Sequence, residues 1–306
     1  MPSLASDWNF VPKVWSDHIM AYFDKLLLFG AVAAIDRTLT EKPGTTHTFP
    51  FYNSIGGAQK PQADEPLIVD KLTSDSFSAT VYEVGKAVGV SDSAIMASGD
   101  GGSPEEVRGN FEEEAQRQMA RVIAEQADAD IITELEVADS HFDCFTSSDA
   151  SAANRMTVSN ILEASITAFG DKHEQAVAIY MHSQHFLDTM RDSTAGFLKA
   201  DANDPFWKQP GFRGRLMGMA LFITDQCPQQ SDIASKKAYA AYIMKANPYG
   251  IAIKKDMQSL EKDRDTLMRE WVVSGTTWMT VKSFHAKIST LDRRVGKMTV
   301  ATNVAA

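Results

Sequence analysis

The chain has few cysteines and no long apolar run. Only Cys144 and Cys227 occur among its 306 residues, so it cannot build a disulfide framework or a four-cysteine zinc site. The longest apolar stretch, Leu26 to Ile35, is about half as long as the ~20 residues that a bilayer-spanning helix needs. The N-terminus lacks the basic start and apolar core of a secretory signal. We therefore expect a soluble cytoplasmic product that has no membrane as a partner.

An excess of basic residues is also absent. The chain carries 30 Lys and Arg against 40 Asp and Glu, which gives a net charge of −10. Clustered cations supply most of the affinity for a phosphate backbone, so we expect weak binding to naked DNA. A composition of 44% hydrophobic and 23% charged residues is typical of a globular protein, and the length allows one large domain or two ordinary ones.

No catalytic motif is complete. Ser183 stands between His182 and His185 directly after a predicted buried strand (176–181), a place where hydrolases often hold a nucleophilic serine. No glycine flanks Ser183 to form an oxyanion pocket. We therefore interpret Ser183 as the cap of a short helix (183–190) and the two histidines as half-buried polar residues.

Metal and cofactor sites are not indicated either. Two acidic groups lie on one predicted helix: Glu112, Glu113 and Glu114, and Asp128, Asp130 and Glu134. Because consecutive residues point in different directions around a helix, we interpret most of them as its solvated face. The sequence thus predicts no catalytic, cofactor-binding or metal site, and a protein that is not an enzyme.

The first ninety residues predict an arm followed by a hairpin. Apolar residues recur at helical spacing from Trp15 to Ile35. Thr46–Tyr52 is short, aromatic and β-prone, 53–66 is polar and contains glycines and prolines, and 72–90 alternates again. Neither strand is rich enough in large apolar residues to bury both faces. We predict an extended hairpin that reaches away from its own core.

The clearest local signal predicts a long helix from 104 to 137. Ser103 can cap it, Pro104 suits the first helical position, and Glu106 completes a capping box. An apolar stripe that includes Val122 follows at steps of mostly four residues. The helix would be about 50 Å long, and we interpret it as a spine along one face of the molecule.

The remainder mixes helices and strands. The patterns predict helices at 158–169 and 183–190, a buried strand at 176–181, a hairpin between 239–244 and 251–253, and long strands in 267–288.

Taken in order, these segments resemble a tailed-phage major capsid protein. The resemblance extends from about Trp15 to Arg294 and is carried by the order of several short motifs. These are Thr48-Phe49-Pro50-Phe51-Tyr52 opening the hairpin, Val84-Gly85-Lys86-Ala87-Val88-Gly89-Val90 closing it, Gly99-Asp100 before the spine helix, Tyr180-Met181-His182-Ser183, and Thr224-Asp225-Gln226-Cys227-Pro228.

The resemblance implies an α+β fold of the Hong Kong 97 type. It implies an N-terminal arm (1–45), an extended loop (46–92), a peripheral domain with the spine helix (93–150 and 266–306), and an axial domain (151–265).

In that family, arm and loop overlap neighbouring subunits. The resemblance therefore implies intersubunit contacts for Trp15 and Phe23 in the arm. Lys60, Asp64 and Glu65 in the loop also suit a polar contact on a neighbour.

The implied function is a shell. Copies would form pentamers and hexamers of an icosahedral capsid that encloses a double-stranded DNA genome without reading its sequence. Scaffolding, portal and decoration proteins are the further partners, no cofactor is implied, and the location is the virion capsid after assembly in the host cytoplasm. Two alternatives remain: a bacterial nanocompartment shell of the same fold, and a serine hydrolase that uses Ser183 with His182 or His185.

Overall fold

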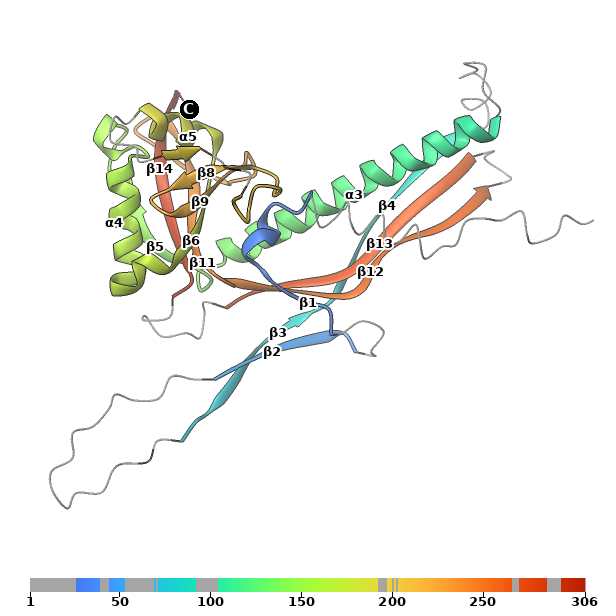
Figure 1. Ribbon diagram of the computed structural model, residues 1–306, viewed down its shortest axis with the longest axis horizontal. Coiled ribbons are helices and arrows are strands. Elements are labelled where there is room, and N and C mark those ends of the chain that lie inside the picture. The colour runs from blue at the N-terminus through green and yellow to red at the C-terminus, as the bar shows by residue number, and fades with distance from the viewer. Residues whose placement is uncertain are drawn as a thin grey trace, which may run out of the picture.

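The computed structural model describes residues 26–38, 44–52, 69, 71–91, 104–191, 197–199, 201, 203–265, 270–284 and 293–305. These residues form a body of sheet and helices, a long helix with a second sheet beside it, and a hairpin that points away from both (Figure 1).

The longest element is helix α3 (Pro104–Glu136), which confirms the helix predicted over 104–137. Its buried face follows residues at steps of three and four, as expected for a helix that covers a core. Val122, which the predicted stripe included, is instead 44% exposed. The buried face is formed by Ala115, Met119, Ala120, Ile123, Ala124, Ala127, Ile131 and Leu135.

Helix α3 runs beside a four-stranded sheet (Figure 1). Three long strands pair antiparallel, and a short strand from the arm joins the edge parallel to its neighbour. The order is β1 (Ala34–Asp36), β12 (Tyr249–Asp265), β13 (Glu270–Ser283) and β4 (Tyr82–Ser91). Strand β13 confirms the strand predicted in 267–288.

The second sheet has eight strands and forms the body. Helices α4 (Val158–Phe169) and α5 (Ser183–Arg191) cover it, with the 3₁₀ helices η3 (Ala152–Asn154) and η4 (Gly170–Gln175) on either side of α4. Both predicted helices and the predicted strand at 176–181 are confirmed. The path is β5 (Phe142–Thr146), β14 (Val295–Ala305), β11 (Lys236–Lys245), β6 (Ala176–Met181), β9 (Met219–Ile223), β8 (Phe212–Leu216) and β7 (Phe197–Lys199), and β10 (Gln229–Ile233) pairs with β11 off this path.

Two hydrophobic cores lie on opposite faces of this sheet. Successive residues of a strand point to opposite faces. In β6, Ala178 and Tyr180 therefore belong to the core shared with α3, whereas Ile179 and Met181 belong to the core under α4 and α5. Strand β6 is thus buried on both faces and connects the two cores.

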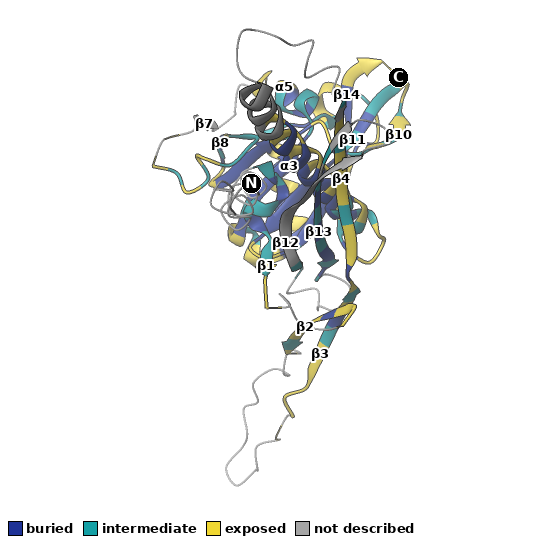
Figure 2. Ribbon diagram, turned by 90° about the vertical axis from the view of Figure 1, so that its right-hand side faces the viewer, coloured by how far each residue is buried: buried dark blue, intermediate teal, exposed yellow. Residues whose placement is uncertain are grey.

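The hairpin is formed by β2 (Thr46–Tyr52) and β3 (Ser74–Thr80), which pair antiparallel with Phe49 opposite Phe77. It projects from the rest of the chain, and much of β3 is exposed (Figure 2). The prediction of a hairpin is confirmed, but its second strand is shorter than the predicted 72–90. The chain changes partner at the buried Val81, after which β4 pairs with β13.

Two other sequence predictions differ from the structure. The helix predicted over 15–35 lies mostly outside the described residues; within them Leu26 is α-helical, but one turn of 3₁₀ helix, η2 (Phe29–Val32), and then β1 follow it. Backbone pairing with the edge of β12 overrides the local helical spacing. The predicted hairpin over 239–253 is absent because β11 and β12 belong to different sheets.

The expected domain ranges remain a proposal, and sheet membership suggests how to adjust them. Strands β5 and β14 fall in the ranges expected for a peripheral domain, yet they pair with each other, and β14 pairs with β11. Strand β12 falls entirely in the range expected for an axial domain, yet it pairs with β13. We propose that β5 and β14 belong to the axial domain and β12 to the peripheral domain.

Within the part of the chain that the structure describes, no helix is both long and apolar enough to cross a membrane.

The packing of Phe77 at the root of the hairpin can be tested by mutation. Phe77 is 4% exposed and packs on Phe51 at 4.6 Å between ring centroids, whereas Tyr52 on the same hairpin is 73% exposed. Phe77→Ala should speed amide hydrogen exchange in β2 and β3 by at least about tenfold, because removing a buried Phe costs about 3 kcal/mol. Tyr52→Ala is the matched control and should leave exchange nearly unchanged. Equal exchange in both variants would contradict this role for Phe77.

Candidate functional site

The residues expected at intersubunit contacts lie outside the described part of the chain. Trp15 and Phe23 precede it in the arm, and Lys60, Asp64 and Glu65 fall between β2 and β3. These contacts therefore stay predictions. What the structure does describe is how the arm and the hairpin are attached to the body, and these attachments are the candidate functional site.

The arm is held by a buried carboxylate of α3. Asp128 Oδ2 and Oδ1 accept hydrogen bonds from the backbone N–H groups of Leu28 and Phe29, both at 3.0 Å. These groups begin the turn of η2, so Asp128 caps it from another element. The Tyr249 hydroxyl group donates a hydrogen bond to the Phe29 carbonyl oxygen. The Phe29 ring stacks on the Tyr180 ring, with 4.4 Å between their centroids.

Asp128 does not belong to the solvated face of α3, contrary to the sequence interpretation. It is 2% exposed. Burial raises the pKa of its carboxyl group to about 7, although the hydrogen bonds from Phe29 and Leu28 oppose this shift. A signal was present in the sequence: Asp128 stands beside Ala127 and between Ala124 and Ile131, within the apolar face.

The other two acidic residues also connect elements. Tyr82 at the start of β4 donates a hydrogen bond to Asp130 at 2.8 Å. Glu134 accepts an ion-paired hydrogen bond from Lys282 of β13 at 2.6 Å and a weaker one from the Ser283 N–H at 3.3 Å. These carboxylates tie α3 to the four-stranded sheet.

A fourth carboxylate, Glu136, ties the end of α3 to the eight-stranded sheet. It accepts hydrogen bonds from Lys297 of β14 at 2.7 Å, from Gln230 of β10 at 3.1 Å, and from the Tyr242 hydroxyl of β11. Burial by itself raises the pKa of Glu136, but the bonds from Lys297 and Tyr242 outweigh it and hold that pKa below its ordinary value.

The hairpin root is an aromatic cluster. Phe49 and Phe77 pack with Phe284, at 5.3 and 5.6 Å between centroids, and against Ala252 of β12. Gly250 lies beneath, where an added Cβ would come within 2.6 Å of Phe284 and Phe49. The hairpin is therefore joined to the end of the four-stranded sheet through a small hydrophobic contact.

The hydrolase geometry is not assembled. His182 Nδ1 accepts a hydrogen bond from the Gln184 N–H at 3.2 Å, so His182 rather than Ser183 caps α5. Its Nε2 faces Asp225 at 3.5 Å, and its ring stacks on Tyr239 at 3.8 Å between centroids. Neither ring nitrogen of His182 is available as a base for Ser183.

His185 serves structure as well. Its Nε2 lies 3.1 Å from the Val300 carbonyl oxygen, and the residue is fully buried rather than half-buried as expected. Burial lowers its pKa to about 4, which keeps the imidazole neutral. Among the described residues, Ser183 has no hydrogen bond to either histidine.

The described residues also contain no group of three or more His, Cys, Asp or Glu side chains placed to hold a metal ion. Cys144 and Cys227 are buried free thiols whose pKa values burial raises.

The attachment of the arm predicts a pH dependence. Because the pKa of Asp128 rises from 3.8 to about 7 on folding, the folded chain holds a proton between these values that the unfolded chain has lost. The stability that this proton contributes is fully present below pH 3.8 and is lost as the pH rises through about 7.

Asp128→Asn removes this titration. The native chain's stability advantage over the variant should therefore shrink as the pH rises from about 4 to about 7, by a few kcal/mol at most. Urea denaturation of both proteins across this range measures the difference. An advantage that grows with pH would show that the ionised carboxylate is the form stabilised in the folded chain.

Comparison with known proteins shows which of them the chain is similar to. No protein-family model matches the chain. It is 23% identical over 236 residues to the major capsid protein of Staphylococcus phage phiMR11, which covers 77% of this chain and 79% of that protein.

Solved structures agree on the fold. The capsid of Ralstonia phage GP4 superimposes with a TM-score of 0.68 at 13% identity, over 89% of this chain and 88% of that one. The capsid of cyanophage Pam1 gives 0.64 at 13% identity over 89% and 88%. The head of Helicobacter pylori bacteriophage KHP40 gives 0.64 at 12% identity over 92% and 90%. The resemblance to tailed-phage major capsid proteins is thereby confirmed, and the chain has their α+β fold of the Hong Kong 97 type.

Proposed function

We propose that this chain is the major capsid protein of a tailed phage, and that its copies assemble into an icosahedral shell around a double-stranded DNA genome. The observation that carries the proposal is the fold, which matches the GP4 capsid chain over 89% of this chain. In the shell, the copies are joined as pentamers and hexamers.

The projecting hairpin supports this role. An isolated two-stranded hairpin is marginally stable in water, and this one packs on the four-stranded sheet of its own chain through the aromatic cluster at its root. Other copies of the chain would cover the part of the hairpin beyond its root. We propose that Lys60, Asp64 and Glu65 contact a neighbour there, and that Trp15 and Phe23 do so from the arm.

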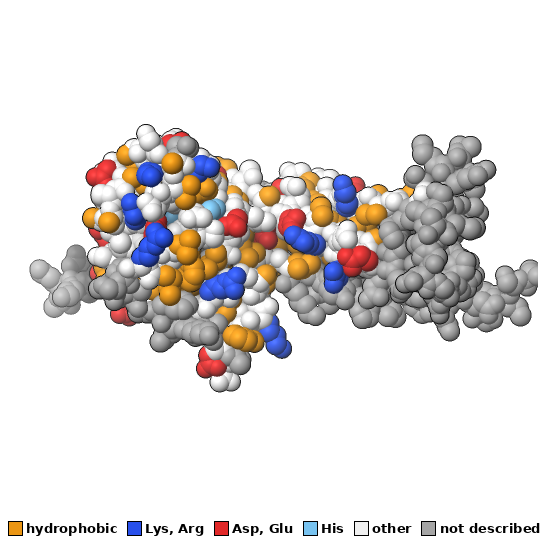
Figure 3. Space-filling model, turned by 90° about the horizontal axis from the view of Figure 1, so that it is seen from above, with side chains coloured by type: hydrophobic (Ala, Val, Ile, Leu, Met, Phe, Trp, Pro, Cys, Tyr) orange, Lys and Arg blue, Asp and Glu red, His pale blue; other side chains and the backbone are white. Residues whose placement is uncertain are grey.

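The surface charge supports enclosure of DNA without sequence-specific binding. The net charge is −10, and acidic and basic side chains are interspersed on the face seen from above (Figure 3). Among the described residues on that face, no single-sign surface of the kind that gives tight phosphate-backbone binding is seen. Scaffolding, portal and decoration proteins complete the proposed partners, with assembly in the host cytoplasm and the virion capsid as final location.

The alternatives have less support. The geometry of His182, Ser183 and His185 does not favour a hydrolase, and we propose that the chain has no enzymatic activity. A nanocompartment shell would share the fold, but the curated relative is a phage major capsid protein.

Electron microscopy tests the proposal. Full-length protein, expressed alone and together with the neighbouring genes of its source genome, should form closed hollow particles of uniform size. A chain that remains a monomer at high concentration in both preparations would overturn the proposal.

The tip of the hairpin gives a sharper test of the neighbour contact. Replacing residues 55–61 by a short Gly-Ser turn should leave the subunit folded, at a cost within about 1 kcal/mol, because closure entropy changes slowly with loop length. Particles should be lost or aberrant, since the contact with a neighbour is removed.

Circular dichroism melting and particle counts decide the outcome. Normal particles from the shortened chain would show that the tip is not an intersubunit contact, and an unfolded subunit would show that it belongs to the core. The control variant carries the same short Gly-Ser sequence inserted at Ala234-Ser235, in the turn between β10 and β11. It shows whether a change in any surface turn damages the chain nonspecifically.

A further inference from the structure

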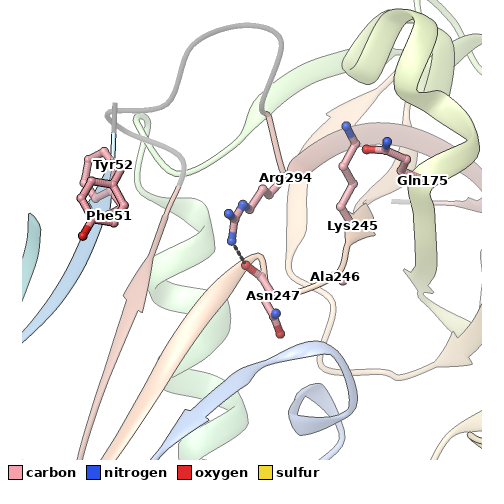
Figure 4. A pocket seen from close by; sticks show the side chains of 7 residues that line it. All are labelled: Phe51, Tyr52, Gln175, Lys245, Ala246, Asn247 and Arg294. Carbon is pink, nitrogen blue, oxygen red and sulfur yellow. Dashed lines mark hydrogen bonds between the residues drawn. The ribbon is translucent and has the colours of Figure 1, made fainter. Parts of the chain in front are cut away.

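A cavity of about 490 Å³ lies between the hairpin and the body. Phe51 and Tyr52 line it from the end of β2. The opposite side comes from the end of η4, the end of β11 with the link after it, and the residue before β14 (Figure 4). The residues on that side are Gln175, Lys245, Ala246, Asn247 and Arg294.

The cavity reverses the charge balance of the chain. Acidic residues outnumber basic ones overall, 40 to 30, yet the described lining holds two cations and no carboxylate. It also holds the side-chain amide of Gln175, which can donate hydrogen bonds and lies beside Lys245 (Figure 4). A small anion would find cationic and neutral donors on one wall.

Arg294 is held in place with donors to spare. Its guanidinium Nη1 donates to the Asn247 carbonyl oxygen at 2.7 Å, and the group lies 5.8 Å from the Phe284 ring centroid. A guanidinium has five N–H donors, and among the described residues this is the one hydrogen bond that the Arg294 side chain donates. Figure 4 shows it between the aromatic residues of the hairpin and Lys245.

Lys245 is the last residue of β11, and Arg294 directly precedes β14. The backbone N–H of Lys245 donates to the Arg294 carbonyl oxygen at 2.9 Å, so the two cationic residues lie on neighbouring backbone segments. Its ammonium lies 4.7 Å from the Phe169 ring centroid, and the residue is 8% exposed. Both cations are therefore pre-organised by the fold.

We propose that this cavity binds an oxoanion of the phosphate class, with Arg294 as the principal ligand and Lys245 as the second cation. A guanidinium fork matches the oxygens of a phosphate through two parallel hydrogen bonds, and such charge-assisted bonds are about twice as strong as neutral ones. The volume is within the range of small-molecule sites, roughly 300–1,000 Å³, so a phosphate ester fits as well as the free ion. Because the cavity borders β2, a bound anion would join the hairpin to the body.

Titration of the full-length protein with inorganic phosphate tests the proposal. Binding is followed by ³¹P line broadening and calorimetry, at constant ionic strength set with sodium chloride, since ions screen such contacts. Arg294→Gln should weaken phosphate binding at least about tenfold, the loss of one strong contact. Arg294→Lys keeps the charge without the fork and should be intermediate.

Arg293→Gln is the matched control. It removes the same charge one residue away, where the guanidinium stacks on Phe142 at 3.5 Å and not in the cavity. Its phosphate affinity should stay within about twofold of native. Melting curves by circular dichroism verify that each variant is folded.

The outcomes separate clearly. Phosphate binding that is lost in Arg294→Gln and kept in Arg293→Gln supports the site. No phosphate binding, or equal binding in both variants, overturns it. Competition with a short oligothymidine then identifies the source of the anion: displacement of phosphate assigns the site to a nucleic-acid backbone, and no displacement assigns it to the free ion.

Discussion

The arrangement of this chain depends on one buried carboxylate and its neighbours on the same helix. Asp128 holds two backbone N–H groups of the arm at 3.0 Å, and Asp130, Glu134 and Glu136 hold β4, β13 and the eight-stranded sheet. Helix α3 thus contacts the arm, the four-stranded sheet and the eight-stranded sheet through separate acidic side chains. Acidic side chains near a helix C-terminus oppose the helix dipole, and Lys282 and Lys297 offset this cost by direct ion pairs.

The chain thus has one large shared core and a hairpin that projects from it. Arm, spine helix and both sheets share one core, whereas the hairpin has its own small cluster at the root. Contacts with other copies of the chain can bury the hairpin surface that its own chain leaves exposed. A subunit of this kind is therefore expected to gain stability on assembly, because any partner that binds only the folded chain shifts the equilibrium toward it.

Several elements were predictable because their signals are local. The start of α3, its periodicity and the strands beside the hairpin tip depend on residues within a few positions of each other. The link between β11 and β12 was misread because a turn signal around Asn247 looks the same whether the following strand returns or enters another sheet. The helical spacing before Ile35 was likewise overridden by edge pairing with β12. The role of Asp128 was missed because its partners lie about one hundred residues away.

The sequence by itself determined the long helix, the alternation of helices and strands, the hairpin and the absence of a complete catalytic motif. Local propensity and hydrophobic period gave the order of these segments, and the fold followed from the resemblance of that order to a tailed-phage major capsid protein. Tertiary structure alone decided which strands pair, where the hairpin ends at Val81, and which acidic residues are buried. It also brought Arg294 and Lys245 to one cavity. These features depend on contacts between residues far apart in the chain, and no local pattern specifies such a partner.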